Sequence, residues 1–266
     1  MKPIRPNFAR PPLVEQAITF MFDRLDGFEI GDYGLFWAMI RHDFPTTEAQ
    51  PPLEPVTEQF EGFRPDQFTF RLVDGGMMPR TFYHSADGCE LVQVQSDRFA
   101  FNWRGGGTAP YPHSEQTMKR FNELFAIFEK FAAERGFPKV QVRQCELVNV
   151  NIVPVDEFGK SFADAPEFFR VPEMGRDIEF LRPETYISSM RHLIEIEGKP
   201  VGRLYSALSP VTRIADDDPA YRLELTARGA PIGGDTAAFF DIARSAINAV
   251  FLSATTKKAR EHWGEQ

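Results

Sequence analysis

The sequence predicts an α+β protein in which antiparallel sheets carry long helices on one face, in two similar β-rich halves that each end in a helix. Three observations predict this class. Apolar and polar residues alternate over several short stretches, as they do on half-buried strands. Two long stretches instead repeat apolar residues every three or four positions, as on amphipathic helices. A glycine cluster precedes each of these two helices.

The composition is that of a globular protein with a substantial core. The chain has 266 residues, 42 % of them hydrophobic, which suffices for one large domain or two small ones. This apolar content excludes a collagen-like or largely disordered chain. Thirty Lys and Arg residues stand against 38 Asp and Glu, giving a net charge of −8. Because nucleic-acid binding needs a basic face, we do not expect a nucleic-acid partner.

The first half, residues 1–138, is expected to hold strands around one helix-bearing sheet. Alternating apolar residues predict a first strand over 13–22, and helical spacing predicts a short helix over 33–44 that Pro45 ends. The proline-punctuated stretch 46–65 is expected to be an irregular connection, a kind of loop that is often functional. Later alternating stretches predict three more strands: 68–72, 91–95 and 98–104.

The clearest helix of the sequence spans 114–135. Its apolar residues step by three and four along one face: Met118, Phe121, Phe125, Phe128 and Ala132. Gly136 follows as a C-terminal glycine would. A helix with this many phenylalanines on one face must pack against the sheet.

The second half, residues 139–266, repeats this order of elements. Strands are expected over four stretches: 140–154, 185–197, 201–209 and 221–228. A last helix begins after Asp235, whose carboxylate suits the positive end of the helix dipole. The acidic, Phe-rich stretch 156–177 is expected to form only helical turns and loop. The two halves share this pattern without any residue-level repeat.

Motifs that carry known chemistry are not found. The five histidines lack metal-binding spacing, and no nucleophile elbow, phosphate-binding loop or dinucleotide-binding glycine motif occurs. We therefore expect no catalytic residue, cofactor or metal. An enzyme of unrecognised type remains open, with Glu146 beside His192 or Arg191 as an example of groups that only the fold brings together. Cys89 and Cys145 form no C-x-x-C pair and are interpreted as small core residues, typical of a reducing cytoplasm.

Two polar clusters are the candidate recognition surfaces. The first surrounds Trp103 and contains Gln93, Gln95, Asn102 and Arg104. The second is the pair Asn149 and Asn151, inside an otherwise apolar strand where asparagine is uncommon. One interpretation is that these amides bond to neighbours or to each other. The other is that they form a polar face or groove where a ligand or protein docks.

Several stretches resemble a sporadically distributed family of uncharacterised bacterial proteins. The resemblance is carried by a Gln-x-x-Arg-Phe-x-Phe-Asn-Trp stretch, Gln95–Trp103, and by further segments: Pro12–Glu15, Leu91–Arg104, Tyr111–Pro112, Glu146–Pro154, Phe251–Thr255 and Trp263–Gly264. Nothing in 156–177 aligns. The resemblance implies a bacterial cytosolic protein of patchy occurrence, as accessory or defence-associated proteins often are. It implies no catalytic residue.

These observations favour a non-enzymatic protein-interaction module that binds a partner or a second copy of itself. The alternative is a small-molecule sensor with an apolar pocket between sheet and helix, lined by Trp103, Asn149 and Asn151. No apolar h-region follows the basic N-terminus, and no window approaches the roughly 20 apolar residues of a membrane span, so a cytoplasmic location is expected.

Overall fold

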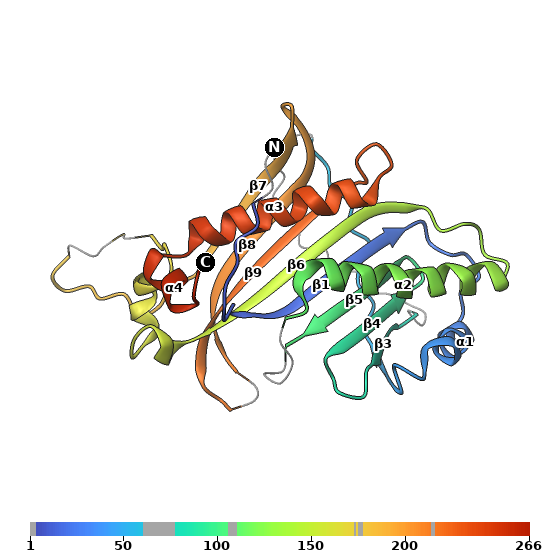
Figure 1. The fold of residues 1–266 in the computed structure, drawn as a ribbon, viewed down its shortest axis with the longest axis horizontal. Coiled ribbons are helices and arrows are strands. Elements are labelled where there is room, and N and C mark those ends of the chain that lie inside the picture. Colours follow the sequence, from blue (N-terminus) through green and yellow to red (C-terminus); the bar gives the residue numbers. More distant parts are fainter. Residues whose placement is uncertain (1–3, 61–77, 106–110, 173, 175–177, 214–215) are drawn as a thin grey trace. The chain divides into compact units, whose positions relative to one another are not determined.

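The computed structural model describes residues 4–60, 78–105, 111–172, 174, 178–213 and 216–266. Its strands are β1 Leu13–Phe22, β2 Thr46–Gln50, β3 Arg80–His84, β4 Glu90–Gln95, β5 Arg98–Arg104, β6 Val142–Pro154, β7 Ser188–Ile196, β8 Lys199–Thr212 and β9 Pro219–Gly229. Its α-helices are α1 Ile30–Ile40, α2 His113–Glu134, α3 Thr236–Ala254 and α4 Lys257–His262. Two 3₁₀ turns, η1 Val155–Glu157 and η2 Phe162–Glu167, complete the described elements (Figure 1).

The strands form one nine-stranded antiparallel sheet in the order β2-β3-β4-β5-β1-β6-β9-β8-β7, with helices packed against it. The predicted α+β class is therefore confirmed. The chain packs as two compact units: unit 1 contains 1–16, 147–228 and 235–266, and unit 2 contains 17–146 and 229–234. The expected halves, 1–138 and 139–266, and their similarity stay predictions.

Most predicted elements are confirmed within a few residues, but two differ. The stretch 46–65 was expected to be irregular throughout, whereas Thr46–Gln50 forms strand β2 and pairs with β3. The prolines begin only at Pro51, so they interrupt no ladder hydrogen bond of β2. The predicted helix over 33–44 lies earlier, because Glu29 and Asp32 form a capping box that starts α1 at Ile30. The strand predicted over 68–72 lies outside the described residues.

The core of unit 2 is an aromatic cluster between α2 and the sheet. Phe99 on β5 is fully buried, and its ring lies 5.3 Å from that of Phe128 and 5.5 Å from that of Phe125 on α2. Phe20 on β1 contacts Phe121, at a ring-centroid distance of 4.7 Å. The predicted packing of this helix against the sheet is thus confirmed.

Helix α1 is joined to the end of α2 by a buried carboxylate. The Asp32 side chain, 1 % exposed, accepts one hydrogen bond from the Glu29 N–H at 2.8 Å and another from Arg135 Nε at 2.6 Å. Arg135 stands at the C-terminus of α2, where a cation is favoured by the helix dipole. This ion pair therefore fixes both helices on the Phe99 face of unit 2.

Helix α3 packs against β8 in unit 1. Asp235 caps it, as predicted, accepting hydrogen bonds from the N–H groups of Ala237 and Ala238 at 2.8 and 3.3 Å. By length and composition alone α3 would also qualify as a membrane span, with a mean hydropathy of 1.3 over its most apolar window, contrary to the expectation of no such window. Of this window 33 % is buried, and Phe239, Ile247 and Phe251 are among the buried residues of α3.

The acidic, Phe-rich stretch supplies a second aromatic cluster, in unit 1. Phe158, Phe168 and Phe169 are buried, and the rings of Phe158 and Phe169 contact the fully buried Tyr221 of β9. The Tyr221 hydroxyl donates to the Phe162 carbonyl at 3.0 Å and accepts from the Tyr186 N–H at 2.9 Å. The stretch therefore forms turns, as predicted, whose phenylalanines anchor it to the sheet.

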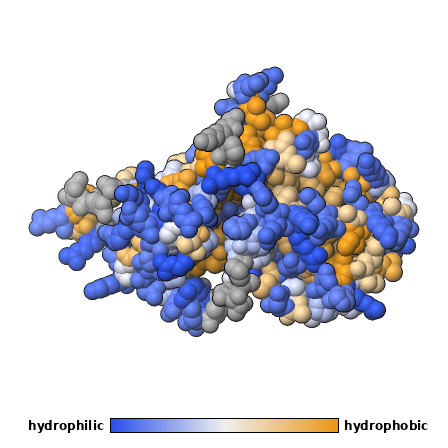
Figure 2. Space-filling view, in the orientation of Figure 1, coloured by the Kyte–Doolittle hydropathy of each residue, from blue (hydrophilic) through white to orange (hydrophobic). Residues whose placement is uncertain are grey.

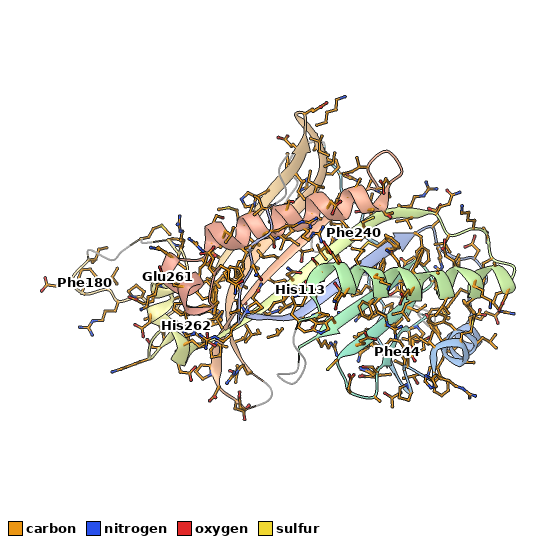
Figure 3. The ribbon with its side chains drawn as sticks, viewed as in Figure 1. Phe44, His113, Phe180, Phe240, Glu261 and His262 are labelled. Carbon is orange, nitrogen blue, oxygen red and sulfur yellow. The ribbon has the colours of Figure 1, made fainter. Side chains whose placement is uncertain are left out.

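We expect Phe99→Ala to lower the free energy of unfolding by about 3–5 kcal/mol, because it opens a cavity inside the aromatic cluster. The matched control is Phe180→Ala, since Phe180 is 86 % exposed and points away from the fold (Figure 3). This control should stay within about 0.5 kcal/mol of wild type in chemical denaturation. Equal effects of the two substitutions would contradict the packing.

Burial raises the pKa of the Cys145 thiol from 9.0 to about 12. The unfolded chain ionises this thiol at lower pH than the folded chain does, so the free energy of unfolding should fall as the pH rises from 9.0 to about 12. Cys145→Ala should make this fall shallower in denaturant titrations over the same pH range. An unchanged pH dependence in the variant would contradict the assignment.

Candidate functional site

Strand β5 is buried on both faces, and this places polar side chains in the interior of unit 2. Successive side chains of a strand point to opposite faces, so Phe99 and Phe101 face the helices while Arg98, Ala100 and Asn102 face the other way. Arg98 and Asn102 are nevertheless only 5 % and 4 % exposed. Because buried polar groups need hydrogen-bond partners, this polar face must be satisfied by other parts of the chain.

Neighbouring strands supply part of these partners. In the β4–β5 register, Leu91 pairs with Asn102, Gln93 with Ala100, and Gln95 with Arg98, so these side chains share the polar face. Gln93 Nε2 donates to Asn102 Oδ1 at 2.7 Å. Gln93 Oε1 accepts from an Arg80 amino group on β3 at 3.0 Å. The result is a chain of hydrogen bonds across three strands.

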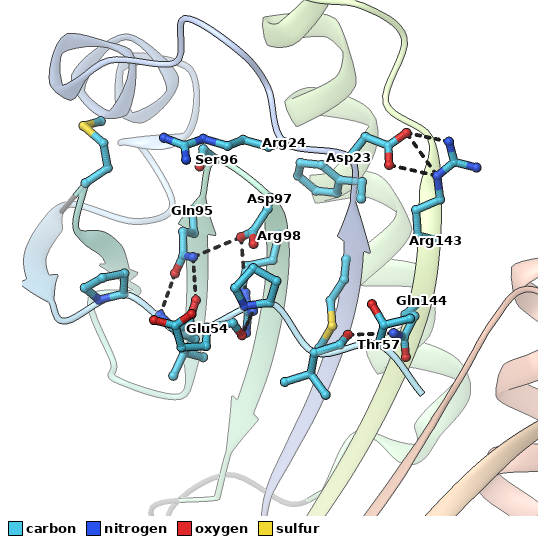
Figure 4. Close-up of a pocket in the computed structure, with 17 residues that line it drawn as sticks. Asp23, Arg24, Glu54, Thr57, Gln95, Ser96, Asp97, Arg98, Arg143 and Gln144 are labelled. Carbon is cyan, nitrogen blue, oxygen red and sulfur yellow. Dashed lines mark hydrogen bonds and ion pairs between the residues drawn. The ribbon is translucent and has the colours of Figure 1, made fainter. Parts of the chain in front are cut away.

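The proline-rich segment 51–57 supplies further partners through its backbone. Gln95 Oε1 accepts from the Leu53 N–H at 2.9 Å while Gln95 Nε2 donates to the Leu53 carbonyl at 2.8 Å, so one side chain binds both polar groups of one residue (Figure 4). Arg98 Nη2 donates to the Glu54 carbonyl at 2.9 Å. Gln144 Nε2, on β6, donates to the Val56 carbonyl at 2.6 Å. Side chains from three strands thus hold the backbone of this segment.

A cavity of about 550 Å³ lies beside this segment. Its size falls in the range of sites that hold small ligands or short peptide stretches. It is lined by the end of β1, the β4–β5 turn, the start of β6 and the segment itself: Met21–Arg24, Pro52–Thr57, Met78, Gln95–Arg98, Arg143 and Gln144. All of these residues belong to unit 2.

Two buried polar atoms of this lining have no hydrogen-bond partner among the described residues, Arg98 Nε and Gln144 Oε1. Arg98 Nε lies 3.5 Å from Asp97 Oδ1, an ion pair without hydrogen-bond geometry. Both side chains are more than nine-tenths buried. An unpaired buried polar atom costs roughly 1–3 kcal/mol, so a ligand that pairs both would recover that cost. One atom is a donor and the other an acceptor.

Charged side chains surround the cavity. Arg143 donates to both carboxylate oxygens of Asp23, with Nε–Oδ1 and Nη2–Oδ2 distances of 2.9 and 2.6 Å. The hydrogen bond from Arg143 lowers the pKa of the Asp23 carboxyl, so this carboxyl is ionised at neutral pH. Arg24 is exposed beside it. The rim is therefore of mixed charge rather than a single-sign anion or cation site.

The predicted cluster around Trp103 is only partly brought together. Gln93 and Asn102 bond directly, on the polar face. Trp103 is buried on the opposite side of β5, where its ring contacts Tyr111 at 5.1 Å. Arg104 is half-buried at the end of β5, where its N–H donates to the Cys89 carbonyl. None of the four lines the cavity; Gln95, from the same sequence cluster, does.

The predicted asparagine pair belongs to unit 1 and is bonded to other strands. Asn149 Oδ1 accepts from Gln16 Nε2 at 3.0 Å, and Asn151 Nδ2 donates to the Leu223 carbonyl at 3.1 Å. These bonds match the interpretation of satisfied amides, and a binding role for either asparagine stays a prediction.

Sequence reasoning missed Arg98, Gln144 and the segment that they hold. The alternation of β5 and β6 placed Arg98 and Gln144 on defined faces but did not show that both faces are buried. The one available signal was the density of prolines after Gln50, since proline leaves carbonyls free for side-chain donors.

The described part of the chain contains no group of three or more His, Cys, Asp or Glu side chains able to hold a metal ion. Glu146 and His192, the example of a fold-assembled catalytic pair, belong to different units. No protein-family model and no curated protein matches this chain.

We expect Gln95→Leu to lower the free energy of unfolding by about 1–3 kcal/mol, because it removes both hydrogen bonds to Leu53 and leaves buried groups unpaired. The control Gln141→Leu replaces an exposed glutamine and should change stability by no more than about 0.5 kcal/mol. Denaturant unfolding measures both. If Gln95→Leu left the free energy of unfolding unchanged, the segment would not be held by these hydrogen bonds.

Proposed function

We propose that the protein is a non-enzymatic, cytoplasmic protein-interaction module that binds an extended polypeptide segment of a partner in the unit 2 cavity. One observation carries the proposal: buried side chains at this site bind polypeptide backbone, and two of them keep an unpaired donor and acceptor. A peptide unit offers a carbonyl for Arg98 Nε and an N–H for Gln144 Oε1. Side-chain recognition would be secondary, through the exposed Leu53 and Val56 at the edge of the cavity.

The chain itself supplies a precedent for this mode of binding. Gln95 recognises Leu53 by the donor–acceptor pair that adjacent strands exchange in a sheet. Backbone recognition gives affinity without demanding one side-chain sequence. We therefore propose a partner segment that lies alongside 52–57, rather than a compact ligand.

We also propose that the chain is related to the uncharacterised bacterial proteins that it resembles, and that its two halves are similar. The order of elements supports the latter: β3, β4, β5 and α2 follow β1 in the chain as β7, β8, β9 and α3 follow β6. In the sheet, β3-β4-β5-β1 on one side corresponds to β7-β8-β9-β6 on the other.

A small-molecule sensor is the second candidate, and the volume of the cavity favours it. About 550 Å³ accommodates a metabolite-sized compound with one carbonyl and one N–H. This cavity differs from the apolar pocket expected between sheet and helix, since Trp103, Asn149 and Asn151 do not line it. Native mass spectrometry of gently purified protein distinguishes the candidates. A retained mass of a few hundred daltons supports the sensor.

The interaction module is tested with a displayed library of random seven-residue peptides as the probe. We expect the wild-type protein to enrich peptides from this library. In the best of these peptides, replacing the amide whose N–H is accepted by Gln144 with an ester should lower the binding affinity about tenfold. The same ester should leave binding to Gln144→Met unchanged, because that variant has no acceptor to lose. Fluorescence anisotropy measures each affinity.

If each amide-to-ester replacement lowered the affinity for wild type and for Gln144→Met equally, this would contradict the assigned role of Gln144. No enrichment above that of unfolded protein would contradict the proposed function itself.

A further inference from the structure

Strand β7 forms an exposed edge of the sheet in unit 1. It is the last strand in the sheet order and pairs with β8. Of its nine residues, only Ile194 is buried, while Met190, Leu193 and Ile196 are 60 %, 49 % and 36 % exposed. The β7–β8 hairpin accordingly shows apolar surface below its polar tip (Figure 2). Exposed apolar edges of this kind favour pairing with another strand.

The sequence of β7 is complementary to itself when it is reversed. In an antiparallel pairing centred on Leu193, Arg191 of each copy lies opposite Glu195 of the other, and this happens twice. Leu193 lies opposite Leu193 between these two ion pairs. All three residues share one face of the strand, since they are two positions apart and the register shift opposite Ile194 and Glu195 places the extra residue, Val201, on β8 rather than on β7.

The other face of the strand is complementary in the same register. Met190 lies opposite Ile196 on both sides of the centre, and His192 lies opposite Ile194. Ile194 is the buried residue of this face and lies near Gly202, and α3 contacts β7, while Met190, His192 and Ile196 stay exposed. Cross-strand apolar and opposite-charge pairs both stabilise sheets.

Neighbouring registers lose this match. Centring the pairing on His192 sets Arg191 opposite Leu193, and centring it on Ile194 sets Leu193 opposite Glu195. The complementarity therefore selects one register.

We propose that the protein forms a symmetric homodimer in which two copies of β7 pair antiparallel, centred on Leu193. The occupant of this edge is thus a second copy of the chain. The Arg191 guanidinium lies 5.4 Å from the centroid of the Tyr205 ring of β8, which is opposite Arg191 in the β7–β8 register. The dimer uses unit 1, so it is independent of the peptide site in unit 2.

The register is tested by disulfide trapping. Cys89 and Cys145 are buried, so a cysteine introduced on β7 is the only exposed thiol among the described residues. Leu193→Cys should yield a covalent dimer on mild oxidation, because the two-fold axis passes beside it. Ser189→Cys, on the same face, lies opposite Glu197 and roughly 26 Å along the strand from its own copy, and should stay monomeric on the gel. Equal crosslinking of both, or of neither, would overturn the register.

Charge reversal tests the ion pairs. Its readout is the recovery of dimers when opposite charges are restored, which loss of folding cannot produce. Arg191→Glu alone and Glu195→Arg alone each set like charges opposite each other twice, so each should weaken dimerisation about tenfold or more in sedimentation. The double variant Arg191→Glu/Glu195→Arg, and the equimolar mixture of the two single variants, should both recover dimers of twice 30.3 kDa. Arg182→Glu, an exposed charge reversal outside β7, should leave the dimer intact.

Failure of both rescues, or a wild-type mass of one chain throughout the concentration series, would overturn the homodimer. Neither result bears on peptide binding in unit 2.

Discussion

The burial of β5 on both faces is the constraint on which unit 2 depends. On one face, phenylalanines satisfy it by packing against α1 and α2, which requires only shape and apolar surface. On the other face, a guanidinium and several amides are removed from water, and each must find a partner. That second requirement explains why an irregular segment with several prolines is held against the sheet by specific hydrogen bonds.

The same requirement connects the fold to a function. Backbone groups of segment 51–57 bond to the buried side chains of Gln95, Arg98 and Gln144, so this face of unit 2 binds polypeptide backbone within its own chain. The segment leaves Arg98 Nε and Gln144 Oε1 unpaired beside a cavity. In the proposed complex a peptide unit of the partner would pair these atoms, whereas the mixed charges of the rim offer no strong preference for an anion or a cation. The self-complementary edge of β7, in unit 1, is the surface of the proposed homodimer.

Local sequence patterns predicted the fold well wherever one periodicity dominated. The α2 stripe, the β1 alternation and the Asp235 cap needed only neighbours within a few residues. The site was less predictable, because it depends on which faces are covered by remote segments. Alternation assigned Arg98 and Gln144 to faces but did not show that residues 53–56 lie against them. Likewise, Asn149 and Asn151 stood out by their type, yet their partners Gln16 and Leu223 come from distant strands.

Amide hydrogen exchange of residues 53–57 tests the central claim most directly. The Leu53 N–H donates to the buried Gln95 side chain, while the N–H groups of Glu54 and Val56 donate to no side chain of the sheet among the described residues. This hydrogen-bond pattern predicts slow exchange at Leu53 in the wild type, faster exchange at Glu54 and Val56, and loss of the Leu53 protection in Gln95→Leu with β4 still protected. Equal, rapid exchange at all three positions in the wild type would contradict it.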